Sequence, residues 1–324
     1  MEQPLSWTVN AKSFPTCCQH CVCQIGRTAF PSPTHPNAAF CRHSCYTQYK
    51  KQLGALDNQA LLELFGSASP ESTNSVLLAY RAVIQQPASF FLEGRARLFT
   101  EHNKEYGTNE AEDWSFHGRD HLYQGLFNLV NHMDALTPEK ELDCVIKAAV
   151  LLRFLISGGY FGGSNSTASL SSDQAYLGAL LATFQCGINY NQHGIYQADG
   201  VIEAGKKLPI SDVGSAFYPN MVLFNHSCCP NTLRINRGRA SYMVAKHTIL
   251  PGEEVTDCYG LHHLASTRDE RAPAIKSGFL FTCRCPACDE NWPPLHQLEG
   301  RLSPGEMAAL GTLLSKYQVC TTLL

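Results

Sequence analysis

The sequence predicts an α+β protein in which irregular segments are held by metal ions. Helical patterns dominate the stretch from residue 56 to residue 186, and short strand patterns separated by turns follow from His193 to Tyr259. This separation of helices from strands along the chain is typical of an α+β fold. Closely spaced cysteines lie within Cys17–Cys45 and Cys283–Cys288, and such spacings indicate metal ligands.

The composition is that of a globular protein in a reducing compartment. The chain has 324 residues, of which 44% are hydrophobic and 16% charged. Its net charge of -3 offers no extended basic surface, so we expect no direct binding to nucleic acid. Residues 1–10 lack the basic and apolar regions of a signal peptide, so the 15 cysteines favour metal binding over disulfides. We therefore expect the protein in the nucleus and cytoplasm.

The first part of the chain is predicted to contain a strand, a loop segment and a helix. Alternating apolar residues at Leu5, Trp7 and Val9 predict the strand. The cysteine-rich segment Cys17–Cys45 also contains prolines and is expected to form loops. A helical pattern follows from residue 56 to residue 65.

The clearest helix is predicted to begin at Pro138 and to end before Gly158. Thr137 can cap it, and proline is favoured at the first helical position. One buried face is expected to contain the apolar residues Leu142, Val145, Ile146, Ala149, Leu152 and Ile156. The most apolar run, residues 145–161, carries basic side chains, so we expect a buried helix and no membrane partner.

Another helix and a series of short strands are predicted to follow. The helix is expected near residues 172–184. Strand segments are predicted at His193–Gln197, Val201–Glu203, Thr232–Ile235, Ala240–Ala245 and the residues that end near Tyr259. Two of them flank Arg237-Gly238-Arg239, which predicts a hairpin. A short helix after Arg268 and a final helix at Ser303–Tyr317 complete the expected elements.

The last third of the chain resembles the C-terminal half of a SET domain, the fold of protein-lysine methyltransferases. The motifs that carry the resemblance are, in order, Asn225-His226-Ser227-Cys228-Cys229-Pro230-Asn231, Gly252-Glu253-Glu254, Tyr259-Gly260 and Cys283-x-Cys285-x2-Cys288. Three cysteines within six positions indicate a structural zinc, which needs four ligands. The resemblance implies Cys228 as the fourth ligand, beside Cys283, Cys285 and Cys288. Ordinary packed thiols are the alternative.

The same resemblance implies S-adenosyl-L-methionine as the cofactor and Tyr259 as the catalytic residue, whose hydroxyl points into the lysine channel. A core tyrosine at the end of a strand is the alternative. The implied cofactor-binding residues are Asn191, Asn225, His226 and Phe281. A helix-capping role is the alternative for Asn191. Phe279 stands where close relatives often have a second tyrosine, a departure that can change the number of methyl groups added or weaken activity.

The N-terminal cysteines resemble a MYND finger, and the two motifs together resemble the SMYD family, in which such a finger splits the SET domain. A full finger holds two zinc ions with four ligand pairs. Here only the first and third pairs, which share a metal, are recognisable, so one zinc is implied, held by Cys18, Cys21, Cys41 and Cys45. The neighbouring residues Cys17, Cys23, His20, His35 and His43 are alternative ligands.

The resemblance defines the expected fold as a SET-type β-sheet core with a zinc finger, a large helical insertion and a post-SET zinc cluster. The expected segments are a remnant of the SET N-terminal strands (1–16), a degenerate MYND-type finger (17–53), the helical insertion (54–186), the SET core (187–262), the post-SET segment (263–294) and the start of a helical C-terminal domain (295–324). Glu2-Gln3-Pro4 resembles the stretch that follows the first SET strands, so we expect an N-terminally truncated member, most similar to the fourth SMYD member and its arthropod relatives.

The implied activity is methyl transfer from S-adenosyl-L-methionine to a lysine amine of a histone or non-histone protein. Such a transfer depends on positioning and requires no catalytic metal, so the two expected zinc ions are structural. The alternative is a weak or inactive SET/MYND module that binds zinc and a partner, such as a peptide at the finger. The missing first strands favour this alternative, because they would supply backbone contacts to the cofactor.

Overall fold

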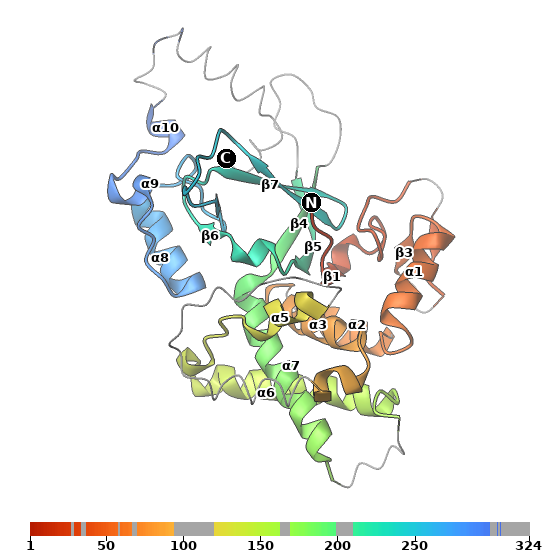
Figure 1. Cartoon of the computed structure of the whole chain (residues 1–324). Coiled ribbons are helices and arrows are strands. Elements are labelled where there is room, and N and C mark those ends of the chain that lie inside the picture. The colour runs from red at the N-terminus through yellow and green to blue at the C-terminus, as the bar shows by residue number, and fades with distance from the viewer. Residues whose placement is uncertain are drawn as a thin grey trace. The chain divides into compact units, whose positions relative to one another are not determined.

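The computed structural model describes residues 1–26, 29–33, 37–57, 59–66, 70–93, 120–162, 169–198 and 210–298, together with Ser303 and Gly305. The chain divides into two compact units, which are described separately (Figure 1). The N-terminal unit comprises Pro4–Ile195 and Val213–Pro219. The C-terminal unit comprises Met1–Gln3, Tyr196–Asp212 and Asn220–Leu324.

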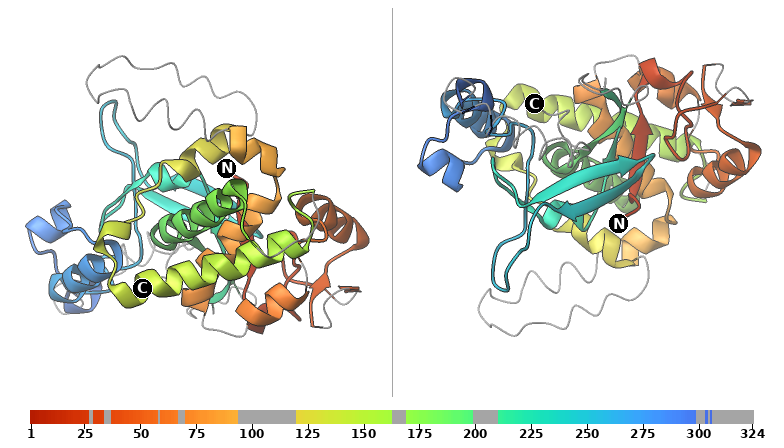
Figure 2. Two further views of the ribbon diagram at one scale, coloured as in Figure 1. Left: turned by 90° about the horizontal axis from the view of Figure 1, so that it is seen from below. Right: turned by 90° about the horizontal axis from the view of Figure 1, so that it is seen from above.

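The N-terminal unit is built mainly from helices. They are α1 (His43–Leu53), α2 (Gln59–Gly66), α3 (Pro70–Ile84), α5 (Asp120–Phe127), α6 (Pro138–Ser157) and α7 (Ser172–Asn191), with short 3-10 turns η1 (Ala11–Ser13) and η2 (Met133–Ala135). Helix α7 packs against both α3 and α6, and it crosses α6 in Figure 1 and lies beside it in Figure 2. The core of the unit lies between these helices, where Leu78, Leu151 and Leu181 are fully buried.

A three-stranded sheet with the order β1-β5-β4 accompanies these helices. Its strands are β1 (Ser6–Val9), β4 (His193–Ala198) and β5 (Ile210–Phe217). Strand β1 runs antiparallel to β5, from the pair Ser6–Phe217 to the pair Val9–Gly214. A Cβ atom on Gly214 would lie 2.1 Å from the Thr8 carbonyl oxygen, so the close approach of the two strands requires glycine.

The C-terminal unit contains the remaining strands and helices. They are η3 (Met221–Leu223), β6 (Asn225–His226), β7 (Thr232–Arg237), β8 (Ala240–Ala245), β9 (Thr256–Asp257), α8 (Arg268–Phe279), α9 (Pro286–Asp289) and α10 (Leu295–Leu298). Strands β7 and β8 form the predicted hairpin, in which Gly238 adopts a φ of 57°. Strand β6 pairs in parallel with β9, which aligns His226 with Asp257.

Helix α6 has the predicted ends but not the predicted buried face. The Thr137 side chain accepts a hydrogen bond from the Lys140 backbone N–H, and the helix ends before Gly158 as expected. However, Leu142, Val145 and Ile146 are 61%, 52% and 53% exposed. Of the predicted face, only Leu152 and Ile156 are buried, and they are joined by Cys144, Ala148, Leu151 and Leu155. The helix carries two overlapping apolar stripes, and the stripe that includes Cys144, Ala148 and Leu151 is the one that is buried.

Helix α1 and strand β5 are among the elements that were not predicted. Helix α1 begins inside the segment that was expected to be loop. Its buried residues Cys45, Tyr49 and Leu53 recur every four positions, which is the spacing of a helix face. Strand β5 lacks alternation, since its last five residues are all buried. Helix α7 extends beyond its predicted end to Asn191. The predicted strand at residues 201–203 and the predicted helix at residues 303–317 fall outside the described residues, apart from Ser303 and Gly305.

The described helices include none that is both long and apolar enough to cross a membrane.

The finger segment pairs β2 (Phe30–Pro31) with β3 (Ala39–Phe40) before α1 begins. The six-segment organisation of the chain stays a prediction.

A buried ion pair joins the finger segment to the helices within the N-terminal unit. Arg81 on α3 contacts Asp57 at 2.9 Å, and their side chains are 1% and 0% exposed. The Tyr49 hydroxyl on α1 donates to the same carboxylate, and Arg81 Nη1 donates to the Trp7 carbonyl of β1 at 2.7 Å. The Arg81 guanidinium therefore links α1, α3 and β1 in a fully buried site.

Replacing Arg81 with Met should destabilise the chain by about 3–5 kcal/mol, because Asp57 would remain buried without its counter-ion. Chemical denaturation of the two proteins measures this difference. Lys147→Met is the control, since it breaks the exposed Lys147–Asp143 pair and should cost about 1 kcal/mol or less. Equal costs for the two variants would contradict the role of burial.

Candidate functional site

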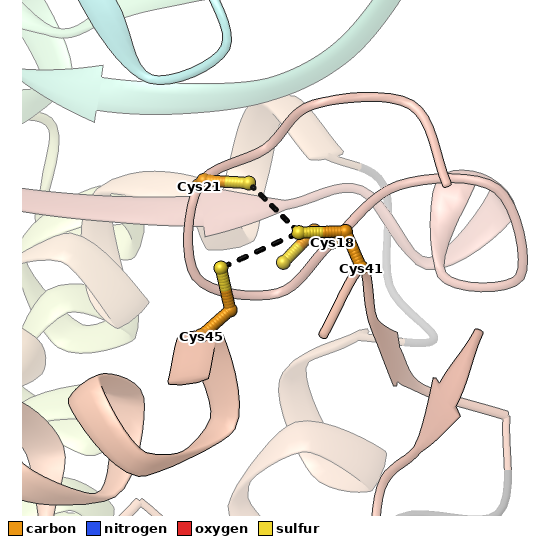
Figure 3. Close-up of side chains that lie close together, drawn as sticks. All are labelled: Cys18, Cys21, Cys41 and Cys45. Carbon is orange, nitrogen blue, oxygen red and sulfur yellow. Dashed lines mark hydrogen bonds between the residues drawn. The ribbon is translucent and has the colours of Figure 1, made fainter. Parts of the chain in front are cut away.

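Four cysteines of the N-terminal unit converge to form a finger cluster of Cys18, Cys21, Cys41 and Cys45 (Figure 3). Their sulfur atoms all lie within 4.8 Å of one another. The Cys41 sulfur is 3.7 Å from that of Cys21 and 3.4 Å from that of Cys45. Zinc–sulfur bonds of about 2.3 Å in a tetrahedron place sulfurs about 3.8 Å apart, so the four thiols fit a structural zinc.

Local backbone structure determines which cysteines enter the finger cluster. The Cys18 N–H donates to the Cys23 carbonyl, and the Val22 N–H donates to the Cys18 carbonyl, so the chain turns tightly between them. Val22 adopts a φ of 59° in this turn. The turn brings Cys18 and Cys21 to the cluster, and the group of converging sulfurs does not include Cys17 or Cys23.

The histidines that were considered as alternative ligands have other contacts where the structure describes them. His20 Nε2 lies 2.9 Å from Gln48 Oε1, and His43 Nδ1 lies 3.5 Å from the Thr47 hydroxyl. Neither belongs to the finger cluster. His35 lies outside the described residues.

A second group, the C-terminal cluster, consists of Cys228, Cys283, Cys285 and Cys288. The Cys228 sulfur lies 3.5 Å from that of Cys288 and 4.0 Å from that of Cys283. Cys285 precedes the short helix α9 and Cys288 lies within it, while Cys228 follows β6. This donor set also fits a structural zinc, which would join segments that are 55 residues apart in sequence.

The electrostatics of the C-terminal cluster favour a cation. Burial raises the pKa of Cys228 well above its ordinary value and raises that of Cys283 to about 11. Burial also opposes ionisation of Cys285, but hydrogen bonds outweigh it and lower its pKa to about 6. The thiols therefore do not ionise together at neutral pH unless a cation compensates their charge.

Aromatic side chains gather around Tyr259 in the C-terminal unit. The ring of Tyr259 lies 5.1 Å from that of Phe279 and 5.2 Å from that of His226, and the ring of Phe281 lies 6.4 Å away. The Tyr259 hydroxyl donates to the Phe224 carbonyl at 2.7 Å. Burial raises the pKa of this phenol, so it stays protonated at neutral pH. Faces of such rings attract cations.

His226 connects Tyr259 to the C-terminal cluster. Its Nδ1 accepts a hydrogen bond from the Tyr259 backbone N–H at 3.0 Å. The neutral ring therefore carries its proton on Nε2, which lies 3.3 Å from the Cys228 sulfur. Burial lowers the pKa of His226 to about 4, which keeps the ring neutral at neutral pH. One imidazole thus contacts both a candidate zinc ligand and the backbone of Tyr259.

The two asparagines of the motif at residues 225–231 have different surroundings. Asn225 is exposed, and its Nδ2 donates to Glu254 at 2.7 Å. Asn231 was not predicted as a site residue, yet its Oδ1 accepts from the Thr256 N–H at 2.9 Å and its Nδ2 donates to the Glu254 carbonyl at 2.8 Å. Asn231 therefore fixes the motif loop to the segment that leads to Tyr259.

Asn191 is the last residue of α7 and belongs to the N-terminal unit. Its Nδ2 donates to the Gly187 carbonyl at 2.8 Å, which is a contact within the last helical turn. This contact agrees with the alternative interpretation, in which Asn191 caps the helix. Its assignment as a cofactor-binding residue stays a prediction.

Sequence reasoning missed Arg271 on α8. This side chain is fully buried beside the C-terminal cluster, with Nη2 lying 3.7 Å from the Cys288 sulfur. Its neighbours Arg268, Asp269 and Glu270 are also charged, so the sequence carried no signal that separated Arg271 from an exposed helix face.

Comparison with known families identifies a SET domain in the chain. The model of the SET domain matches residues 99–260, which is half of the 324-residue chain. The chain therefore belongs to the SET-domain family. The match ends at Gly260, directly after Tyr259, and the mixture of helices and strands confirms the predicted α+β fold.

Similar proteins place the chain more narrowly, in the SMYD group. Mouse "Protein-lysine N-methyltransferase SMYD4" is 26% identical over 179 residues, which are 51% of this chain and 22% of the mouse protein. Human "N-lysine methyltransferase SMYD2" is 39% identical over 79 residues, which are 24% of this chain and 18% of the human protein. The matched stretch thus spans about a fifth of the length of these relatives.

Metal analysis of the purified chain should find two zinc ions per molecule. Cys45→Ser should remove the ion of the finger cluster and Cys285→Ser that of the C-terminal cluster, because three thiols hold zinc much more weakly than four. Cys258→Ser is the control, since Cys258 belongs to neither group of sulfurs. A ligand variant that keeps both zinc ions would contradict the assignment of its cluster.

Proposed function

We propose that the chain is an S-adenosyl-L-methionine-dependent protein-lysine N-methyltransferase whose site lies around Tyr259. The observation that carries the proposal is the linkage of Tyr259, His226 and the C-terminal cluster within one compact unit. Membership of the SET-domain family and the printed names of the relatives support it. The substrate would be a histone or non-histone protein of the nucleus or cytoplasm.

The proposed chemistry places few demands on acid–base catalysis. Bound S-adenosyl-L-methionine would supply an electrophilic methyl group on a positive sulfonium. The protein would align a lysine amine with that group and keep water away, and the rings of Tyr259, Phe279 and Phe281 provide an apolar wall for this purpose. An apolar surrounding also lowers the pKa of a lysine amine, which must be neutral to attack.

The protonated Tyr259 hydroxyl would orient the reacting groups. It already donates to the Phe224 carbonyl, so its oxygen lone pairs remain as acceptors for an amine or a polarised methyl group. Phe279 supplies no second hydroxyl here, since its side chain is a hydrocarbon ring. We propose that Asn225, His226 and Phe281 contact the cofactor, as the family resemblance implies. The same role for Asn191, which belongs to the N-terminal unit, stays a prediction.

We also propose that both cysteine clusters hold zinc and that the finger is of the MYND type with a single ion. The spacing of the four sulfurs in each cluster supports this assignment. The zinc ions would act structurally, because all four ligand positions in each site would be occupied by protein thiolates.

The alternative function is a SET/MYND module that binds a partner with little or no catalysis. Two observations favour it. Asn225, proposed to contact the cofactor, is engaged by Glu254. Phe279 also stands where the family often has a second tyrosine. A module of this kind would still need both clusters for its fold.

Tyr259→Phe should lower methyl transfer by about 100-fold or more while leaving cofactor affinity nearly unchanged, because the hydroxyl acts on the reacting groups. Calorimetry with S-adenosyl-L-methionine measures binding. Transfer of a radiolabelled methyl group to histones and to cytosolic proteins measures activity. Tyr242→Phe on β8 is the matched control and should keep both.

The wild-type result separates the two functions. Cofactor binding with transfer supports the enzyme. Cofactor binding without transfer to either protein mixture supports the inactive module. Failure of the folded, zinc-loaded chain to bind S-adenosyl-L-methionine would refute the proposed enzyme for this chain.

A further inference from the structure

The side chain of Arg271 is a buried cation in the core of the C-terminal unit. It is 0% exposed, although helix α8 carries charged residues on both sides of it. The hydrophobic cluster around it comprises Cys228, Ile275, Ala287 and Cys288, with Trp292 packed against them. A positive charge in such a place is strongly unfavourable unless negative charge or hydrogen bonds compensate it.

The contacts of Arg271 supply hydrogen bonds but no carboxylate. Nη1 donates to the Ser266 carbonyl, and Nη2 donates to the Ala287 carbonyl at 3.3 Å. Among the ion pairs of the described residues, none includes Arg271. Further contacts are with sulfur, because Nη2 lies 3.7 Å from Cys288 Sγ and the guanidinium also interacts with the Cys228 thiol.

A zinc-loaded C-terminal cluster would provide the missing negative charge. Four thiolates outweigh one divalent cation, so the loaded site is formally a dianion. Its sulfurs are buried or half-buried, so solvent does not fully screen that charge. An N–H group directed at a thiolate stabilises its ionised form, and charge-assisted hydrogen bonds are the stronger ones.

The finger cluster provides a contrast within the same chain. There the arginine beside the thiols is Arg42, whose side chain is exposed and precedes α1. Water can therefore share the compensation of charge at the finger cluster. Among the residues that the structure describes, only the C-terminal cluster has an arginine that is both buried and in contact with a ligand sulfur.

We propose that Arg271 is a positioning residue of the C-terminal zinc site, which contacts the Cys288 sulfur and compensates the charge of the loaded cluster. His226 donates to Cys228, another ligand of the same cluster, so two side chains direct N–H donors at the ligand sulfurs. Groups that hydrogen-bond to metal ligands commonly change metal affinity by about 10- to 100-fold. The inference rests on zinc binding at this cluster and does not depend on methyl transfer.

Zinc release to an excess of a strong chelator tests the role of Arg271 in the full chain. Aliquots are treated with an alkylating reagent, and mass spectrometry of the peptides shows which ligand cysteines have lost their metal. In Arg271→Met, Cys285 should become reactive about 10- to 100-fold faster than in the wild type. Cys41 of the finger cluster should react at the wild-type rate.

Arg284→Met is the matched control. It removes the same charge between two ligands of the same cluster, but Arg284 is 81% exposed and pairs with Asp289. The Arg284→Met variant should retain zinc at the C-terminal cluster as the wild type does. Arg271→Lys keeps the charge with fewer donors and should release zinc at an intermediate rate.

Four outcomes would overturn the proposal. The first is wild-type protection of Cys285 in Arg271→Met, and the second is an equal effect of Arg284→Met. The third concerns folding. If Arg271→Met loses both zinc ions, the variant has failed to fold. Arg271→Lys then decides, and loss of both ions there as well would mean that the side chain serves packing alone. A wild-type chain without zinc at this cluster would instead refute the metal site itself, and the proposal with it.

Discussion

The convergence of Cys228 with Cys283, Cys285 and Cys288 is the constraint on which the C-terminal unit depends. These thiols come from a loop after β6 and from the segment around α9, and few large apolar side chains surround them. A short segment with so small a core orders poorly without help, and a tetrahedral metal site can provide the missing free energy. Helix α8 and Phe281 lie between the two parts of the cluster in sequence, so their positions follow from it.

The interactions beyond the sulfurs explain how a structural site can influence the residues proposed to act in methyl transfer. His226 is the connection, because its two ring nitrogens face the Cys228 sulfur and the backbone of Tyr259. Asn231 fixes the same loop from its other end through Thr256 and Glu254. The motif at residues 225–231 thus combines a candidate metal ligand, a bridging imidazole and a loop anchor within seven positions.

The parts of the structure that could be predicted are those with strong local chemistry. The spacing of cysteines indicated two metal sites and the family resemblance added Cys228 to the second, while Thr137 and Pro138 marked the start of α6 and Gly238 marked the hairpin. The buried face of α6 could not be predicted, because two apolar stripes compete and only the contact with α7 decides between them. Arg271 also escaped detection, since burial of a charged side chain is a property of tertiary packing.

The link from Cys228 through His226 to Tyr259 also has a practical consequence. Chelators and thiol-modifying reagents are common in purification buffers, and both attack cysteine–metal sites first. In this chain their effect would reach the surroundings of Tyr259 through His226 and through Phe281, which packs against the same cluster. A preparation made in such buffers would therefore have altered surroundings of Tyr259 without any change in its sequence, so the buffer history of a sample matters as much as its sequence.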